Sequence, residues 1–170
     1  MKKGLFGLIT LVLAVSCWTG ASLASGTVEV WGVDVINFGT YSAEIQQMED
    51  ITHSPGGRRR IVTKTRFLEE TTRIPAVLGT RFGFRYVVNG IPKKEKVCIK
   101  VRKIYPGLKD PRNDNLLYSH EYIREHEIGE IYGTGYGFDH DWELVPGEWV
   151  FQLLYEGKIL GEISFEVYKP

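Results

Sequence analysis

Cysteine is scarce in this sequence, and its scarcity limits how the fold can be stabilised. Of the 170 residues only Cys17 and Cys98 are cysteines, and Cys17 lies in a segment that we predict to be removed. The remaining domain therefore cannot form an intrachain disulfide, and its core must hold the fold together. Cys98 stands between Val97 and Ile99, a setting that favours a small buried hydrophobe over a reactive thiol or an intermolecular disulfide.

An excess of charge of either sign is also missing. The chain has 21 basic and 21 acidic residues, so its formal net charge is zero. Proteins that bind nucleic acid usually carry a clustered basic excess, whereas the basic cluster here is only Arg58-Arg59-Arg60. Such a short run beside a turn is typical of a solvated surface. The composition therefore argues against a nucleic-acid-binding protein.

The sequence lacks the motifs of common catalytic sites. No serine stands in a nucleophile-elbow sequence, and the arginine cluster lacks the lysine pattern of a phosphate-binding loop. Cys98 has no recognisable catalytic context. We therefore expect a protein that is not an enzyme and needs no cofactor.

Long hydrophobic runs are confined to the start of the chain. Two lysines precede an apolar run from Leu5 to Val15, and small residues follow at Ser22 and Ala24. A cationic start, a short apolar run and small residues before the cleavage point are typical of a secretory signal peptide. The run is shorter than the roughly 20 residues that a membrane span needs. We predict a cleaved signal peptide over residues 1–24 and no transmembrane segment.

The predicted signal places residues 25–170 outside the cytoplasm, in the periplasm or beyond the cell. This length suits one domain with a buried core. Cys17 offers an alternative, because it follows small residues as the acylated cysteine of a bacterial lipoprotein does. However, Leu13 stands four residues before Cys17, where lipoproteins usually place a leucine three before it. Lipidation would tether the domain to a membrane surface without changing its fold.

Apolar residues recur with a period of two along residues 25–170, which is typical of half-buried strands. The segments predicted as strands are 28–38, 61–67, 82–88, 96–105, 130–138, 149–155 and 163–167. In the first segment the alternation changes phase at Trp31-Gly32, which predicts a β-bulge. Residues 117–126 fit either a strand or a short helix.

Turn-forming residues separate these strands. Ser54-Pro55-Gly56-Gly57 predicts a turn, and Asn89-Gly90 predicts a tight hairpin between the strands on either side of it. Glu156-Gly157-Lys158 predicts a second hairpin that joins the last two strands. Residues 106–115 are rich in proline, aspartate and asparagine, so we expect a long loop there. Ile74-Pro75 interrupts the alternation.

Strand number and turn chemistry together predict the fold class. About seven short strands without a convincing helix indicate an all-β fold, an antiparallel immunoglobulin-like β-sandwich. The cysteine pair of antibody domains is missing. Only the architecture of that class is therefore predicted.

Three stretches of the chain share features with known exported domains. They run from Val35 to Tyr41, from Arg81 to Tyr86 and from Trp142 to Phe151, the last continued by Tyr155 to Lys158 and Phe165 to Val167. Together they resemble a bacterial family of exported domains of unknown function with an immunoglobulin-like β-sandwich. The shared residues are turn and core residues. The resemblance therefore implies a fold and transfers no catalytic residue.

One group of side chains has the chemistry of a metal site. It consists of His120, His126, Asp139, His140 and Asp141. Imidazoles and carboxylates bind metals and also serve as general bases, but these spacings match no known ligand signature. Solvated polar residues or local hydrogen-bonding partners are the simpler interpretation. A metal-binding protein or a metal-dependent hydrolase is therefore an alternative function.

A second candidate site is aromatic. Tyr132, Tyr136 and Trp142 lie in a stretch punctuated by glycines. Exposed aromatic rings commonly contact sugars and peptides, but tyrosine and tryptophan are equally common in cores. We expect Trp142 to be part of the core, whereas either setting fits the two tyrosines.

These observations favour a binding function over catalysis. We predict a non-enzymatic binding or interaction module of the bacterial cell envelope that engages a protein, a peptide or a glycan. Loop ends or an exposed strand edge would form its contact surface, because an open edge offers unpaired backbone donors and acceptors. A structural component that spaces or stabilises a larger assembly is a further alternative.

Overall fold

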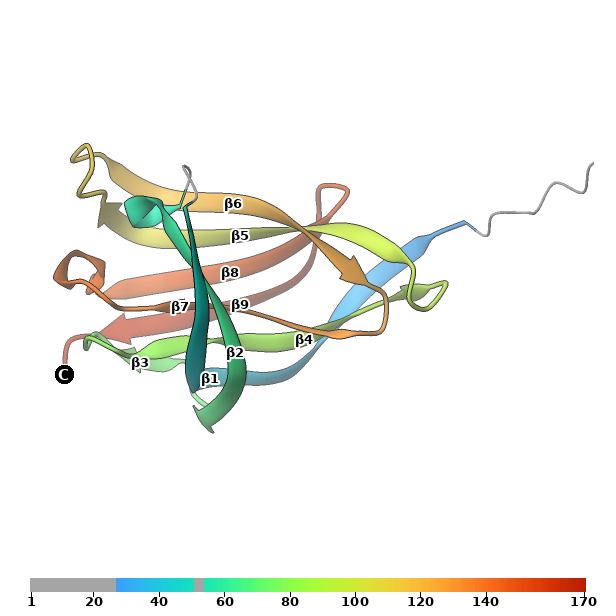
Figure 1. Ribbon diagram of the computed structural model, residues 1–170, viewed down its shortest axis with the longest axis horizontal. Coiled ribbons are helices and arrows are strands. Elements are labelled where there is room, and N and C mark those ends of the chain that lie inside the picture. The colour runs from blue at the N-terminus through green and yellow to red at the C-terminus, as the bar shows by residue number, and fades with distance from the viewer. Residues whose placement is uncertain (1–26, 51–53) are drawn as a thin grey trace, which may run out of the picture.

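The computed structural model describes residues 27–50 and 54–170 (Figure 1). The predicted signal peptide and Cys17 lie outside these residues. Within them the chain forms nine β-strands and two short 3-10 turns, η1 (Pro55–Gly57) and η2 (Asp141–Glu143). No helix in this part of the chain is long and apolar enough to cross a membrane.

The strands form two sheets that pack face to face. The four-stranded sheet has the order β2-β1-β4-β7, with β1 Glu29–Asp50, β2 Arg58–Glu69, β4 Arg81–Ile91 and β7 Ile131–Gly137. The five-stranded sheet has the order β3-β9-β8-β5-β6, with β3 Arg73–Pro75, β5 Lys96–Lys109, β6 Leu116–Glu127, β8 Gly147–Tyr155 and β9 Lys158–Tyr168. Only β3 and β9 pair in parallel among the described strands. The predicted all-β antiparallel sandwich is confirmed.

The described residues form nine strands where about seven were expected. Residues 117–126, which fitted strand or helix, lie within strand β6. The short strand β3 contains Ile74-Pro75, where the sequence shows only an interruption. Three residues that include a proline are too few for a period of two to appear.

Aromatic side chains centred on Phe82 form the core between the sheets. Its ring lies 5.7 Å from Trp149, 5.6 Å from Phe151 and 5.2 Å from Phe165, measured between ring centroids. These residues come from β4, β8 and β9, so the contacts join the two sheets. Alternation along β4 buries Phe82, Phe84, Tyr86 and Val88, as the sequence predicted.

Two local predictions about strand geometry are confirmed. The β1–β4 ladder shifts register between Val30 and Gly32, where the sequence predicted a bulge. The last two strands pair as a hairpin closed by Glu156 and Gly157, whose φ angles are 48° and 82°. Two consecutive positive φ angles define the turn that matches the twist of antiparallel strands.

The hairpin predicted at Asn89-Gly90 is wrong. Both residues belong to β4 and pair with β1, while β5 lies in the other sheet, so the chain crosses between sheets through residues 92–95. Gly90 has a different role from that of a turn residue. A Cβ atom at this position would lie 2.3 Å from the carbonyl oxygen of Glu29. Glycine is therefore required by the close approach of β1.

The loop predicted over residues 106–115 is shorter than expected, because residues 106–109 are strand and only residues 110–115 connect β5 to β6. Strand β5 continues to Lys109, which pairs with Leu116 of β6. The ladder shifts register between Ile104 and Leu108, and Gly107 there has a φ of 128°. A bulge accepts proline and glycine without breaking the sheet. Proline and glycine at 106 and 107 thus mark a bulge and not the end of the strand.

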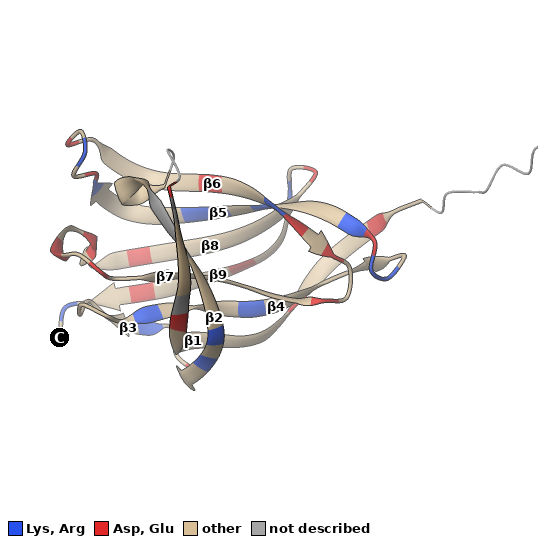
Figure 2. Cartoon of the chain, viewed as in Figure 1, with Lys and Arg blue, Asp and Glu red and all other residues tan. Residues whose placement is uncertain are grey.

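The expectation that Cys98 is buried is also wrong. Val97 and Ile99 point into the core, so the alternation of β5 places Cys98 on the outer face, where it is exposed opposite Glu125 of β6. Charged residues share the exterior with it, and Figure 2 shows both signs mixed over the strands in view.

We predict that the aromatic core dominates the stability of this fold. Phe82→Ala should lower the free energy of unfolding by about 3–5 kcal/mol, because it leaves a cavity among the five aromatic rings that surround Phe82. The matched control Ile159→Ala removes a side chain that is 52% exposed and should cost less than about 0.5 kcal/mol. Urea denaturation measures both, and equal losses would contradict this account of the core.

Candidate functional site

The two sheets differ in extent on the side of the sandwich where β7 and β6 are the edge strands. Strand β7 ends the four-stranded sheet and β6 ends the five-stranded sheet. Figure 1 shows the β1–β2 hairpin crossing in front of β7 toward β6. Inward-facing side chains of β6, among them His120 and Tyr122, line a cleft on this side.

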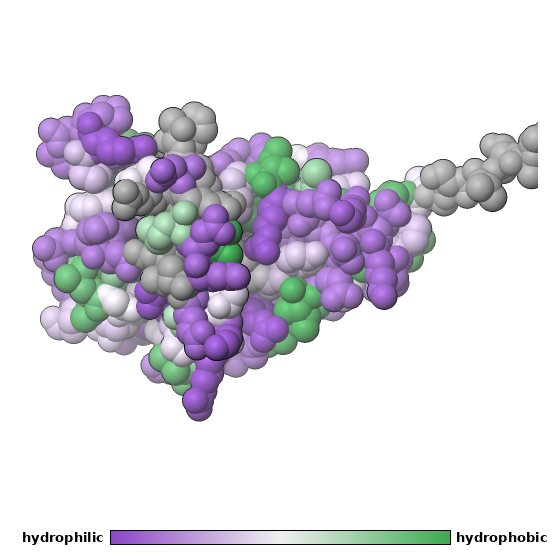
Figure 3. All heavy atoms as spheres, viewed as in Figure 1, coloured by the Kyte–Doolittle hydropathy of each residue, from purple (hydrophilic) through white to green (hydrophobic). Residues whose placement is uncertain are grey.

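This cleft has a volume of about 1050 Å³ and lies between β7, the inner face of β5 and β6, and strand β2. It matches the size of large ligand sites in proteins. Its lining combines aromatic, charged and small polar side chains, among them Tyr41, Thr63, Arg81, Lys103, Tyr122, Arg124, Thr134, Tyr136 and Trp142. The face crossed by the hairpin is mostly hydrophilic with isolated hydrophobic patches (Figure 3).

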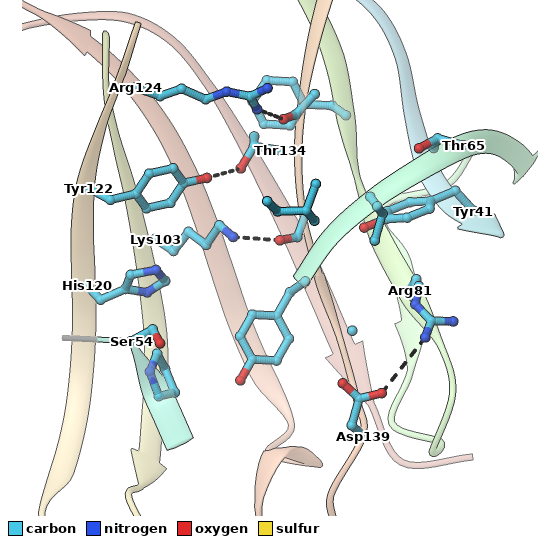
Figure 4. A pocket seen from close by; sticks show the side chains of 18 of the residues that line it. Tyr41, Ser54, Thr65, Arg81, Lys103, His120, Tyr122, Arg124, Thr134 and Asp139 are labelled. Atoms are coloured by element: carbon cyan, nitrogen blue, oxygen red, sulfur yellow. Dashed lines mark hydrogen bonds and ion pairs between the residues drawn. The ribbon is translucent and has the colours of Figure 1, made fainter. Parts of the chain in front are cut away.

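Lys103 forms the floor of the cleft. Its side chain is only 7% exposed, and its Nζ donates a hydrogen bond of 2.5 Å to the carbonyl oxygen of Gly135 (Figure 4). The rings of Tyr122, Tyr136 and Phe151 lie 5.6, 5.9 and 5.4 Å from Nζ. Ring faces attract a cation at such distances, which offsets part of the cost of burying it. The cleft therefore has a fixed positive charge at its base.

His120 stands beside Lys103 as a neutral ring. Its Nδ1 is hydrogen-bonded to the hydroxyl of Tyr105, and its ring stacks 5.8 Å from that of Tyr122. Burial, with the charge of Lys103 as a smaller cause, lowers the pKa of His120 to about 3. Burial also raises the pKa of the Tyr105 hydroxyl well above its usual range. Both groups are therefore uncharged at neutral pH.

Side chains from β5 and β6 bridge the cleft to β7. The hydroxyl of Tyr122 lies 3.3 Å from Oγ1 of Thr134, and Nη1 of Arg124 donates to the carbonyl oxygen of Gly133 over 3.5 Å (Figure 4). Together with the bond from Lys103 to Gly135, these contacts attach the edge of β7 to the other sheet. The cleft thus has defined walls.

Glu143 fixes one end of the cleft. It is buried in turn η2, and one carboxylate oxygen accepts a hydrogen bond of 2.8 Å from the hydroxyl of Tyr136. The other oxygen accepts the backbone N–H groups of Asp139 and His140, at 2.6 and 2.8 Å. Carboxylates bound to backbone N–H groups in this way hold a turn in place. Asp139 in turn lies 3.9 Å from the guanidinium of Arg81.

The structure brings the three aromatic candidates together. Tyr132, Tyr136 and Trp142 all line the cleft and are half-buried. The ring of Tyr136 packs 4.9 Å from Trp149 in the core, and the hydroxyl of Tyr132 accepts the backbone N–H of Glu127 at 2.8 Å. Each of these tyrosines therefore contacts both the interior and the cleft.

The candidate metal ligands are divided. His120, Asp139 and His140 line the cleft, whereas His126 and Asp141 do not. In the described part of the chain, no group of three or more His, Cys, Asp and Glu side chains is arranged to hold a metal ion. The ring of His140 instead stacks on that of Trp142, with 6.0 Å between the ring centroids.

His126 lies on the same inner face of β6 as His120, opposite Val97 of β5, but there it is fully buried and outside the cleft. Its Nδ1 lies 2.9 Å from the carbonyl oxygen of Arg124, and its Nε2 lies 2.7 Å from the hydroxyl of Tyr86. Because a carbonyl only accepts, Nδ1 carries the hydrogen and Nε2 accepts from Tyr86. Burial lowers the pKa of His126 to about 4. This histidine is a satisfied core residue.

The sequence analysis missed the two buried charged residues of the cleft, Lys103 and Glu143. Residues Val97, Ile99 and Val101 mark the inward face of β5, and Lys103 continues that face. A lysine at an inward position was therefore the available signal. Glu143 gave no such signal, because its burial depends on turn η2.

Two antiparallel-rich sheets packed around a common core define an immunoglobulin-like β-sandwich. The crystal structure of an immunoglobulin-like protein from Pseudomonas aeruginosa has the same fold, with a TM-score of 0.59 and 23% sequence identity over 85% of this chain and 99% of that chain. Residues 30–167 match the family described as Domain of unknown function (DUF3859), and the chain belongs to this family. The predicted resemblance to uncharacterised immunoglobulin-like domains is thereby confirmed. No curated protein matches the chain.

We predict that His126 and His120 make the fold acid-sensitive. Their pKa values of about 4 and about 3 lie below the value of 6.5 that applies to an unfolded histidine. Between pH 6.5 and pH 4 the unfolded chain therefore binds protons that the folded chain does not, so the free energy of unfolding falls as the pH is lowered. Urea titrations from pH 6.5 to pH 5 should show this slope. An equal slope in a His120→Gln/His126→Gln double variant would contradict the assignment.

Proposed function

We propose that this domain is a non-enzymatic binding module of the bacterial cell envelope and that the cleft is its ligand site. The observation that carries the proposal is Lys103, a buried cation at the floor of a cleft of about 1050 Å³. Burying an ammonium group costs free energy, and departures from the usual rules of folding are expected at functional sites. A large cleft with a few convergent polar groups is the usual form of a ligand site.

The hydrogen bonds and pKa values of the acidic and basic side chains support a binding function over a catalytic one. The carboxylate of Glu143 accepts three hydrogen bonds that hold turn η2, so its role is structural. His126 has both ring nitrogens engaged, and the low pKa of His120 makes it a weak base. General base catalysis needs a group whose pKa lies near the working pH.

The chemistry of the cleft indicates what kind of ligand it accepts. Among the described lining residues the cations are Lys64, Arg81, Arg85, Lys103 and Arg124, and the anions are Glu121, Asp139 and Glu143. This basic excess favours a ligand with carboxylate groups. Aromatic and hydroxyl side chains along the walls suit a peptide or a glycan.

A variant that fills the cleft tests this function. Thr63→Trp places an indole in the cleft, and the matched control Ile159→Trp places one on an exposed strand end. The wild-type domain and Ile159→Trp should retain the same ligand from an extract of the bacterial envelope, whereas Thr63→Trp should not. Mass spectrometry identifies what is retained, and melting curves confirm that each variant folds. Identical retention by all three proteins would contradict a ligand site in the cleft.

The envelope location has a separate test. When the whole sequence is produced in a Gram-negative host, the intact mass of the product should correspond to residues 25–170, and the protein should be released by osmotic shock. A product that begins at Cys17 with acyl mass, found in the membrane fraction, would show lipidation instead. An unprocessed chain in the cytoplasm would contradict export.

A further inference from the structure

The edge of β7 presents backbone hydrogen-bonding groups to the cleft. Among the described strands, β7 pairs only with β4 and so ends its sheet. The carbonyl oxygens of Gly133 and Gly135 accept hydrogen bonds from Arg124 and Lys103, which come from the opposite side to β4. In an antiparallel ladder the N–H of a residue points the same way as its carbonyl. The N–H groups of Gly133 and Gly135 are therefore also directed toward the cleft.

The four-stranded sheet leaves part of the other sheet uncovered. The inward residues of β5, such as Ile99 and Val101, are buried. On the neighbouring strand β6, by contrast, Tyr122 is half-buried and Arg124 is exposed. In Figure 1, β6 extends past β7 at this edge. One more strand beside β7 would cover the inner face of β6.

Strand β7 has the sequence of an edge that accepts another backbone. Glycines at 133, 135 and 137 alternate with side chains that face the interior. Gly135 is required by packing, because a Cβ atom there would lie 2.7 Å from the backbone carbonyl oxygen of Phe82 and 2.5 Å from the hydroxyl of Tyr41. At Gly133 a Cβ atom would make only ordinary contacts, 3.6 Å from the carbonyl oxygen of Phe84. Position 133 can therefore carry a small side chain without disturbing the strand, and its N–H can be tested separately from its side chain.

We propose that the ligand is an extended peptide with acidic side chains, which pairs as an added strand with the edge of β7. This inference rests on the proposed binding function of the cleft. Side chains of such a strand alternate, so every second one points to the floor, where Lys103 and Arg124 supply positive charge. The remaining side chains point to β2, where Thr63 and Thr65 line the cleft.

The bonding of the aromatic rings favours a peptide over a glycan. Sugars bind to open ring faces, but the ring of Tyr132 packs 4.0 Å from His126, and the guanidinium of Arg124 lies 5.3 Å from its centre. The rings of Tyr122 and Tyr136 are both contacted by Lys103. The cleft thus offers backbone groups and charges more than ring faces, which is the chemistry of strand addition.

A random library of 12-residue peptides displayed on phage provides the probe. Peptides selected on residues 25–170 should be rich in Asp and Glu at alternate positions. Synthetic, fluorescently labelled copies are then titrated against Gly133→Pro and Gly133→Ala, with anisotropy as the readout. Gly133→Pro removes the N–H of β7 and should weaken binding by roughly tenfold or more, whereas Gly133→Ala keeps the N–H and should stay within about threefold.

Two further measurements separate the parts of the proposal. Lys103→Met should remove the preference for a Glu peptide over its Gln counterpart, while melting curves show that the variant folds. Methylating the peptide backbone at single positions should reduce binding at every second residue, because only alternate N–H groups face β7.

The outcomes distinguish this inference from the function on which it rests. Selected peptides that bind Gly133→Pro as tightly as the wild type would overturn pairing with β7, and a selection without acidic preference would overturn the charge complementarity. A further outcome is a library that yields no binder, while envelope glycans bind the wild type and not Thr63→Trp. That result would overturn the claim that the ligand is a peptide, but the cleft would remain a ligand site. If neither a peptide nor an envelope glycan binds the wild type more tightly than it binds Thr63→Trp, the proposed function itself is contradicted.

Discussion

The contact between Lys103 and the edge of β7 connects the fold of this protein with its proposed function. The core between the sheets is aromatic, and the four-stranded sheet that covers it ends at β7. At that boundary the structure places an ammonium group, which donates to the carbonyl oxygen of Gly135 and lies among three aromatic rings. An apolar residue would close the sandwich there, whereas a cation keeps a polar surface between the sheets. The cleft exists because the sheets remain apart at this point.

Much of the architecture could be predicted from local pattern. Alternation located the strands around Phe82 and Trp149, the phase change at Trp31-Gly32 located a bulge, and Glu156-Gly157 located the last hairpin. The path between sheets could not be predicted in this way. Turn residues indicate where a chain reverses, but they do not say whether the next strand joins the same sheet, and the error at Asn89-Gly90 has this origin.

The candidate site was predicted less completely than the fold. Tyr132, Tyr136 and Trp142 line the cleft, because three positions close in sequence fall on β7 and the turn that follows it. The histidines were harder to place, since His120 and His126 lie six residues apart on the same strand and yet belong to different environments. Which neighbours a strand residue meets depends on the register and on the opposite sheet, and neither is visible in one sequence.

The immunoglobulin-like fold supports many unrelated functions, so the proposed function depends on the site and not on the architecture. The most direct measurement is the amide NMR spectrum of the domain with and without a ligand that depends on the cleft. We expect the resonances of Gly133 and Gly135 to shift, while Gly157 in the β8–β9 turn stays unchanged. Shifts that spare both glycines of β7 and lie instead at the β8–β9 turn would contradict the central claim, that this protein binds its ligand in the cleft between its sheets.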